Sequence, residues 1–282
     1  MYDVAIIGTG PAGLSAALTL KLHNKEIIWF GSPALSDKVG KSEKIANYPG
    51  VPMVSGTDLN AAFEAQAKEM ELEPKDARVT NIADMGGKYM VLADNEVYET
   101  RAILLATGVA SAKGMEGEAE LLGRGVSYCA TCDGFLYKGK TVAVFCTDER
   151  MAHDIKYLEE ICGKVYVYTS FGYEAAAETT EKLGSPFKKL SGGLKCDSVE
   201  LANGTKLDVD GVFILRPAIA PATLFPGLET EGAHIKAGRS QETNYKGCYA
   251  AGDCTGRPYQ IAKAVGEGNV AAHAILEYLN EQ

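Results

Sequence analysis

The spacing of apolar and polar residues predicts a strand–helix–strand unit in the first thirty residues. Residues 4–8 form a short, uninterrupted apolar run, which is typical of a fully buried strand. A helical pattern over 11–24 and a second apolar run over 26–30 follow at the distance that a βαβ unit requires. These elements are therefore expected to belong to a parallel sheet.

Helical and strand-like patterns continue through the first hundred residues. An amphipathic helix is predicted over 57–72, and either Thr57 or Ser55 can cap its start. A small antiparallel sheet and then one more buried strand are predicted from the segments 77–82, 88–92, 97–99 and 102–108.

A second α/β unit is predicted to begin near Lys140. It has a strand over 141–146, a helix over 149–162 and a strand over 164–170. Further strands are predicted at 186–190, 195–201, 206–216 and 246–253, and a long helix at 260–280.

The order of these elements predicts one domain interrupted by another. The fold class is α/β, with two Rossmann-like three-layer domains, the second inserted in the first. We expect the outer domain to comprise 1–111 and 216–282 and the inserted domain to comprise 112–215.

The net charge of the chain limits the classes of molecule that it is expected to bind. The chain of 282 residues has a formal net charge of −9 and a pI near 5.1. This acidic balance argues against nucleic acid and anionic membranes as main partners. No apolar run is long enough for a transmembrane helix, and the first residues have a strand pattern rather than that of a signal peptide. We therefore expect a cytoplasmic protein.

Three glycines follow the first predicted strand in the spacing G-x-G-x-x-G. Gly8 permits a tight turn, Gly10 lets the backbone approach a pyrophosphate, and Gly13 lets helix and strand pack closely. The helix N-terminus then attracts the phosphates. A dinucleotide site is predicted, and the alternative is a βα turn that is merely tight. Because the second strand does not end in an acidic residue, Ser32 or the backbone is expected to bind the ribose.

Two of the seven cysteines, Cys129 and Cys132, form the motif C-A-T-C-D with Asp133. Such a pair can close a small disulfide, and one of its thiols often has a lowered pKa. Asp133 is either a surface acid or the group that moves the proton of thiol–disulfide exchange. A zinc site needs further ligands, and the four histidines are isolated, so no metal is predicted. The other cysteines are interpreted as buried apolar side chains: Cys146, Cys162, Cys196, Cys248 and Cys254.

Several motifs in their order resemble those of the low-molecular-weight thioredoxin reductases. The glycine motif, the sequence N-Y-P-G at 47–50, A-T-G at 106–108, C-A-T-C-D and G-D at 252–253 all occur. The segment 259–261 stands where that family's last helix brings its backbone to the flavin. The resemblance covers the whole chain and implies the flavin disulfide reductase fold.

The resemblance also implies a chemistry. Cys132 would be the sulfur nearest the flavin, Cys129 the one that attacks thioredoxin, and Asp133 the acid/base, in a homodimer. The outer domain would bind one FAD. The residues expected at the FAD are Gly8, Gly10, Pro11, Ala12, Gly13, Gly31, Ser32, Asn47, Val79, Ala106, Thr107, Gly108, Gly252, Asp253, Tyr259, Gln260 and Ile261.

The inserted domain departs from the resemblance. Ordinary members bind NADPH there through a glycine-rich turn and a later basic cluster. Here Cys146, Asp148 and Met151 replace the small residues of the turn, and 169–171 replaces the basic cluster. The side chains of these residues therefore block the approach of a phosphate, and the Asp148 carboxylate repels it. No arginine is present at 169–171 to bind a 2′-phosphate. NADPH binding is predicted to be lost.

An intact dithiol without a nicotinamide site resembles the ferredoxin-dependent flavin thioredoxin reductases. Reduced ferredoxin would then deliver single electrons to FAD, which passes two to the disulfide and on to thioredoxin. Two alternatives stay open: another reductant, such as NADH, NADPH in an unusual site or a deazaflavin, and a catalytically silent flavin-binding protein. Ferredoxins are usually acidic, so docking needs a basic patch; Lys38, Lys41 and Lys44 either contribute to one or form an ordinary solvated face.

Overall fold

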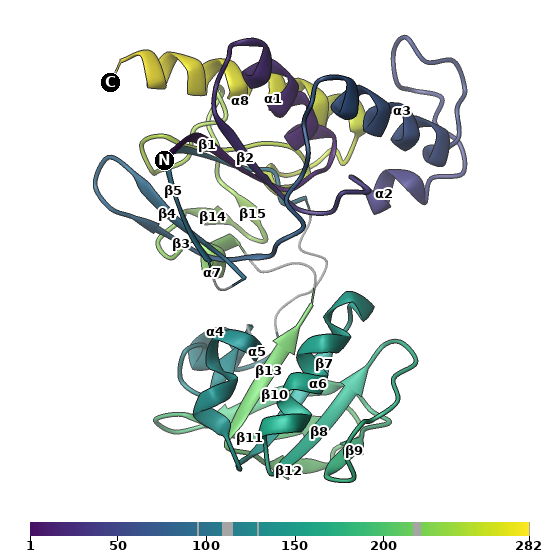
Figure 1. Cartoon of the computed structure of the whole chain (residues 1–282), viewed down its shortest axis with the longest axis vertical. Coiled ribbons are helices and arrows are strands. Elements are labelled where there is room, and N and C mark those ends of the chain that lie inside the picture. Colours follow the sequence, from purple (N-terminus) through teal and green to yellow (C-terminus); the bar gives the residue numbers. More distant parts are fainter. Residues whose placement is uncertain (95, 109–114, 129, 217–220, 282) are drawn as a thin grey trace. The chain divides into compact units, whose positions relative to one another are not determined.

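The computed structural model describes residues 1–94, 96–108, 115–128, 130–216 and 221–281 and has two compact units (Figure 1). The first unit comprises Met1–Ser111 and Ala220–Gln282, and the second, inserted unit comprises Ala112–Ile219. Both combine helices with parallel sheets, so the structure confirms the predicted α/β fold class.

The first unit is built on a parallel sheet. Strand β1 (Tyr2–Ile7) pairs in parallel with β2 (Ile27–Phe30) on one side and with β5 (Glu96–Leu105) on the other. Strand β16 (Cys248–Ala250), from the far end of the chain, also pairs in parallel with β5. The strands therefore end together at one edge, where nucleotides bind in folds of this class.

The sequence analysis predicted a small antiparallel sheet at 77–99. In the structure this antiparallel part continues the parallel sheet of the first unit. Strands β3 (Val79–Asp84) and β4 (Tyr89–Ala93) pair with each other, and β4 pairs with the first half of β5. Strand β5 has ten residues and runs without a break through 97–99 and 102–105, so the strands predicted at 97–99 and 102–108 are one strand that ends at Leu105. The polar residues between them are accommodated because Arg101 Nη1 bonds Asp3 Oδ1 at 3.1 Å and Thr100 Oγ1 donates to the Ala102 carbonyl.

Two helices cover one face of this sheet. Helix α1 (Pro11–Leu22) and helix α8 (Ile261–Asn280) lie side by side there, and both contribute to the core around Val4 and Ile6 (Figure 1). Their backbones touch, because a Cβ added at Gly268 would overlap the carbonyl oxygen of Ala12. The sequence could not show this contact, since it joins residues from opposite ends of the chain.

The remaining helices and strands of the first unit are short except for one helix. Helix α3 (Gly56–Glu69) begins at Ser55, whose hydroxyl accepts a hydrogen bond from Asp58 N at 3.0 Å, so Ser55 rather than Thr57 is the cap. The others are α2 (Asp37–Gly40), α7 (Pro221–Leu224), β14 (Thr230–Glu231), β15 (His234–Ile235) and the 3₁₀ turn η3 (Asp253–Thr255).

The second unit has a five-stranded parallel sheet. Its strands run in the order β6 (Val126–Ser127), β13 (Gly211–Leu215), β7 (Thr141–Cys146), β8 (Lys164–Thr169) and β9 (Thr180–Lys182). An antiparallel sheet contains β10 (Phe187–Gly192), β11 (Cys196–Leu201) and β12 (Lys206–Asp208). The short helical elements are α4 (Glu118–Leu121), α5 (Ala130–Asp133), η1 (Gly134–Tyr137), η2 (Glu149–Met151) and α6 (Ala152–Ile161).

The prediction of a single strand at 206–216 is wrong, because the structure divides this segment between the two sheets of the second unit. Strand β12 pairs with β11, whereas β13 pairs with β6 and β7. The break falls at Val209 and Asp210, and the Asp210 carboxylate accepts a hydrogen bond from Thr141 N at 3.0 Å. The sequence marks this break, since two aspartates and a glycine interrupt the apolar positions between 208 and 211.

The second unit has three layers. On one face of the parallel sheet, Val142 and Val144 pack with Ile155 and Leu158 of α6. On the other face, the ring of Phe145 lies 5.5 Å from that of Phe187 in the antiparallel sheet. Within the described residues of both units, no helix is long and apolar enough to cross a membrane.

The contact between α1 and α8 gives a paired test of this fold. Gly266 and Gly268 lie on the same helix, but a Cβ at Gly266 meets nothing within 4 Å. Gly266→Ala should raise the free energy of unfolding by about 0.5–1 kcal/mol, because alanine favours helix more than glycine does. Gly268→Ala should lower it by about 1–3 kcal/mol, because the helices must separate.

Urea denaturation measures both variants. Trp29 is the only tryptophan and lies in the first unit, so its fluorescence follows the unit that changes. Equal stabilities for the two variants would contradict the close packing of α1 on α8.

Candidate functional site

The turn between β1 and α1 depends on glycine at two positions. Gly8 has φ +113°, and a Cβ there would overlap the carbonyl oxygen of Ala106. A Cβ at Gly13 would likewise overlap the carbonyl oxygen of Gly8. The turn, the start of α1 and the end of β5 therefore approach as closely as backbones can.

Gly10 differs from these two glycines because space is open beside it. A Cβ at Gly10 would meet nothing within 4 Å, and its φ of −68° suits any residue. Gly10 is the N-cap of α1, and no side chain caps the helix. The free N–H groups of the first turn and the helix dipole therefore face a space that an anion such as a phosphate can fill.

The glycine turn has two contacts that the sequence analysis missed. The indole Nε1 of Trp29 donates to the Gly8 carbonyl at 2.9 Å and so holds the turn from β2. Gly31 has φ +140°, and a Cβ there would lie 2.9 Å from the side chain of Thr9. Thr9 in turn donates from Oγ1 to the Leu35 carbonyl at 2.8 Å. The segment after β2 is thereby fixed against the turn.

The ends of β5 and β16 lie beside the glycine turn. Ala106 N bonds the Ile7 carbonyl at 2.8 Å, and Ala251 N bonds the Leu105 carbonyl at 3.0 Å. A Cβ at Gly252 would lie 2.9 Å from that of Ala12. The structure therefore brings three of the predicted cofactor-binding segments to one edge of the sheet: 8–13, 106–108 and 252–253.

Asp253 lies in a cluster of charged and aromatic side chains. Its Oδ2 is 2.5 Å from Nζ of Lys38, and that ammonium lies 5.0 Å from the ring centroid of Tyr259. Arg257 lies 5.2 Å from the same ring, and Nε2 of His234 is 2.7 Å from the Tyr259 hydroxyl. Lys38 is therefore a cation at the predicted site, not only a surface lysine of α2.

The other predicted cofactor residues are placed as follows. Asn47 Nδ2 donates to Gln260 Oε1 at 2.7 Å, directly before Ile261, the first residue of α8. Pro11 is the first residue of α1, and the Ser32 hydroxyl accepts a hydrogen bond from Ala34 N in a local turn. Val79 lies on the edge strand β3 with its side chain buried, so that side chain is not available to a ligand.

A partly buried network, which the sequence analysis also missed, supports the turn at Gly252. Glu267 Oε2 accepts hydrogen bonds from Gly252 N at 2.8 Å, Thr255 Oγ1 at 3.0 Å and Lys263 Nζ at 3.0 Å. Lys263 also donates to the Gly252 carbonyl at 2.9 Å. Three side chains of α8 and η3 thereby fix the backbone that presents Asp253.

These features fit a flavin dinucleotide. The open cradle at Gly10 suits the pyrophosphate, and the fixed turn at Gly252 presents a carboxylate to hydroxyl groups. Lys38 and Tyr259 add a cation and an aromatic ring at the same edge.

The last four residues of the C-A-T-C-D motif form the short helix α5 of the second unit. Cys129 and the side chain of Cys132 lie outside the described residues, but α5 includes the backbone of Cys132. Asp133 Oδ2 accepts a hydrogen bond from Ser127 Oγ at 2.6 Å, which orients its carboxylate. A Cβ at Gly134 would lie 2.8 Å from the Tyr157 ring and 3.1 Å from Leu158, so the motif packs closely on α6.

The other five cysteine side chains are buried. Burial raises the pKa of Cys162 and of Cys254 to about 11, and that of Cys248 to about 12. Burial also raises the pKa of Cys196. These thiols are therefore poor nucleophiles, which agrees with their interpretation as apolar side chains.

Two of the histidines are not isolated. The rings of His23 and His273 lie 6.0 Å apart in an edge-to-face arrangement, although the sequence separates them widely. Among the residues that the structure describes, no group of three His, Cys, Asp or Glu side chains could hold a metal ion.

In the second unit, side chains of the turn after β7 bond one another. Asp148 caps η2 by accepting from Arg150 N at 3.1 Å, and its Oδ2 lies 2.7 Å from Arg150 Nη2. Arg150 Nε also donates to both carboxylate oxygens of Asp148. Cys146 Sγ donates to the Asp148 carbonyl at 3.3 Å. A carboxylate and its guanidinium thus stand where the first unit has its open glycine cradle.

The segment 169–171 closes on this turn. Ser170 N bonds the Cys146 carbonyl at 3.2 Å, and the Ser170 hydroxyl bonds the Thr147 carbonyl at 3.4 Å. The Thr169 hydroxyl donates to the Phe171 carbonyl at 2.8 Å. These hydroxyls satisfy backbone groups, and none of the three residues carries a positive charge for a 2′-phosphate.

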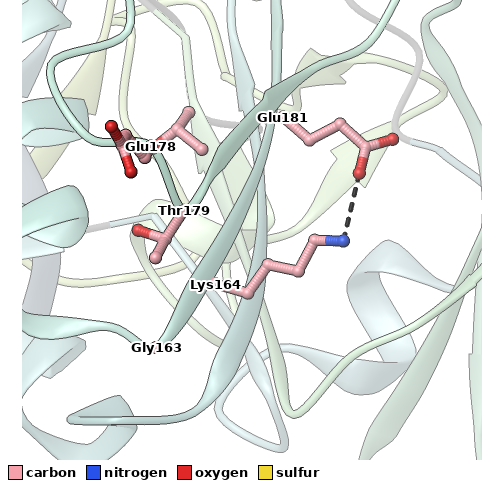
Figure 2. Close-up of a pocket in the computed structure, with 6 residues that line it drawn as sticks. Gly163, Lys164, Glu178, Thr179 and Glu181 are labelled. Carbon is pink, nitrogen blue, oxygen red and sulfur yellow. Dashed lines mark ion pairs between the residues drawn. The ribbon is translucent and has the colours of Figure 1, made fainter.

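Figure 2 shows a hollow elsewhere in the second unit, with a volume of about 310 Å³. It lies at the start of β8, where Lys164 Nζ is 3.0 Å from Glu181 Oε2, and Glu178 and Thr179 also line it. Nucleotides bind at the carboxyl ends of parallel strands, and this hollow lies at the opposite end. It is therefore not the missing nucleotide site.

Comparison with known proteins agrees with this geometry. Residues 2–150 match the family described as pyridine nucleotide-disulphide oxidoreductase. A thioredoxin reductase of Helicobacter pylori is 31% identical, over 99% of this chain and 99% of that protein. One of Bacillus subtilis is 30% identical, over 100% of this chain and 96% of that protein.

Solved structures agree as well. A ferredoxin-flavin thioredoxin reductase from Clostridium acetobutylicum has a TM-score of 0.90 and 40% identity, and covers 99% of this chain and 98% of that one. A thioredoxin reductase from Gloeobacter violaceus has a TM-score of 0.80 and 28% identity, with coverages of 99% and 94%. The predicted flavin disulfide reductase fold is therefore confirmed. The chain belongs to the pyridine nucleotide-disulphide oxidoreductase family and is a thioredoxin reductase-like flavoprotein with FAD as its cofactor.

Proposed function

We propose that this protein reduces thioredoxin with electrons that it receives from reduced ferredoxin rather than from NADPH. FAD would bind to the first unit, and Cys129 and Cys132 would form the redox-active disulfide. When bound, FAD accepts electrons one at a time and releases them in pairs, which matches a one-electron donor to a dithiol.

The observation that carries the proposal is the ion pair between Asp148 and Arg150. It occupies the turn after β7, so the carboxylate would meet the phosphates of a nicotinamide nucleotide. The Asp148 side chain is only 10% exposed, and Glu149 follows it. A phosphate would have to displace this carboxylate from Arg150 and from the N–H group that it caps, because two anions cannot share the turn. An electron donor that binds elsewhere is therefore favoured.

The choice of ferredoxin rests on similarity. The Clostridium acetobutylicum protein, 40% identical, is named for both ferredoxin and flavin. We infer that this chain uses the same class of donor, an iron–sulfur protein that supplies single electrons.

The chain's own residues suit the acceptor side of the reaction. Reduction of thioredoxin requires the Cys129 thiolate to attack its disulfide, and Cys132 then displaces reduced thioredoxin from the mixed disulfide. Asp133, oriented by Ser127, would move the proton between thiol and solvent. The next residues include Phe135 and Leu136, which are 65% and 53% exposed and offer an apolar surface to a protein substrate.

We expect Gly10→Val to weaken FAD binding without unfolding the protein. The space beside Gly10 is open in the fold, and the valine side chain would fill the place of a phosphate. The affinity for FAD should fall by about tenfold or more, while the thermal stability of the FAD-free protein stays unchanged. Titration of the FAD-free protein, followed by flavin fluorescence, measures the affinity.

Gly184→Val is the matched control, because a Cβ there also meets nothing within 4 Å but lies in the second unit. It should leave the affinity for FAD unchanged. Parental affinity in Gly10→Val would show that the cofactor does not use this turn.

The two cysteine variants should fail differently. Cys132→Ser keeps the attacking Cys129 thiol and removes the one that resolves the mixed disulfide, so a covalent complex with thioredoxin should accumulate. Cys129→Ser should give no such complex. Non-reducing electrophoresis after incubation with oxidised thioredoxin measures this, and a complex formed only by Cys129→Ser would reverse the two roles.

The electron donor is tested by rapid mixing without oxygen. Reduced ferredoxin should bleach the visible absorption band of the flavin and support thioredoxin turnover, whereas NADPH should do so slowly or not at all. Replacing Cys146 and Asp148 together by glycine should not give NADPH activity, because Glu149 remains and 169–171 has no cation. Saturable reduction of the flavin by NADPH in the parent protein would refute the proposal.

A further inference from the structure

The second unit contains an ion pair that is almost completely buried. Glu118 and Arg216 are bonded, and their side chains are 2% and 7% exposed. Among the ion pairs between residues that the structure describes, every other one has at least one side chain at 20% exposure or more. An arginine keeps its charge even when buried, so it requires this carboxylate.

Glu118 is the shared acceptor of three groups. Its Oε1 accepts from the Tyr128 hydroxyl at 2.6 Å and from Arg216 Nη2, and its Oε2 accepts from Met115 N at 2.8 Å. The guanidinium of Arg216 also lies 5.9 Å from the centroid of the Tyr128 ring. These contacts define one cluster, Glu118–Arg216–Tyr128.

The cluster connects three positions of the chain: the start of the second unit, its end, and the residue before Cys129. Met115 and Glu118 stand where the chain enters the second unit, and Arg216 stands where it leaves. Tyr128 immediately precedes Cys129 in the sequence. A single carboxylate therefore fixes the entry, the exit and the residue before the first redox cysteine.

We propose that the Glu118–Arg216–Tyr128 cluster positions the redox-active cysteine pair. Its members are positioning residues, because they act through the backbone that leads into Cys129. The proposal rests on the dithiol assigned under the proposed function. It predicts that loss of the Tyr128 hydroxyl changes the reactivity of the cysteines more than it changes the stability of the unit.

The chain supplies a matched control for this test. Tyr173 is also buried and also donates its hydroxyl to a buried glutamate of the second unit, Glu159 Oε2, at 3.0 Å. Tyr128→Phe and Tyr173→Phe therefore remove the same kind of hydrogen bond. A purely structural role predicts the same consequences for both.

The experiment reduces the FAD-containing protein chemically and then follows the reaction of its thiols with a small aromatic disulfide. No ferredoxin and no thioredoxin are needed. Tyr128→Phe should change the rate constant by about fivefold, the scale of one buried hydrogen bond. It should also shift the midpoint potential of the disulfide in a thiol redox buffer. Tyr173→Phe should leave both values unchanged, although its thermal stability falls to a similar extent.

A second pair of variants tests the charge. Glu118→Gln keeps the shape of the side chain but leaves Arg216 without its counter-charge, and should change the rate in the same direction as Tyr128→Phe. The double variant Glu118→Gln, Arg216→Met removes the buried charge and should return the stability towards that of the parent protein. The same rate constant in the parent, Tyr128→Phe and Glu118→Gln proteins would overturn the inference alone. Failure of Cys129 and Cys132 to form a disulfide in the parent would overturn the proposed function as well.

Discussion

The close approach of backbones at the first glycine turn is the constraint on which the binding unit depends. Gly8 and Gly13 have no room for a Cβ, so β1, α1 and the end of β5 meet within the width of a peptide group. That contact brings 106–108 beside the turn, and Gly252 joins them from the far end of the chain. A side chain at Gly8 or Gly13 would push β1, α1 and the end of β5 apart. A side chain at Gly10 would only occupy the open space at the N-terminus of α1.

The two units differ in what lies at the N-terminal end of the helical segment that follows the first strand of each unit's strand–turn–helix motif. In the first, the N-terminus of α1 has no capping side chain and the glycine backbone leaves its N–H groups accessible. In the second, Asp148 caps η2 from within the chain, and Arg150 neutralises it. The carboxylate supplies the negative charge that a bound phosphate would otherwise supply, so the turn is stable without a ligand.

The sequence predicted what is encoded locally and missed what depends on distant contacts. The glycine turn, the dithiol motif and the α/β class follow from short spacings, whose physical reasons lie within a few residues. The contacts of Trp29, of Lys38, and of Lys263 and Glu267 with Gly252 could not be predicted, because their partners lie on other elements of the folded chain. The same limit explains one error in the strands, because β5 continues through polar residues that find partners across the sheet. The other error had a local signal, since Asp208, Asp210 and Gly211 interrupt the apolar positions where 206–216 changes sheets.

Helix α6 shows why a domain can keep its fold after its nucleotide turn has changed. One end of the helix follows the turn that Asp148 and Arg150 occupy. Its side packs on β7 and on η1, directly after α5, where Gly134 meets Tyr157 and Leu158 without space for a Cβ. Under the proposed function, nucleotide binding would depend on the first of these regions and the position of the cysteines on the second. Substitutions in the turn would then remove one function and leave the other, since they do not touch the side of α6 that contacts Gly134.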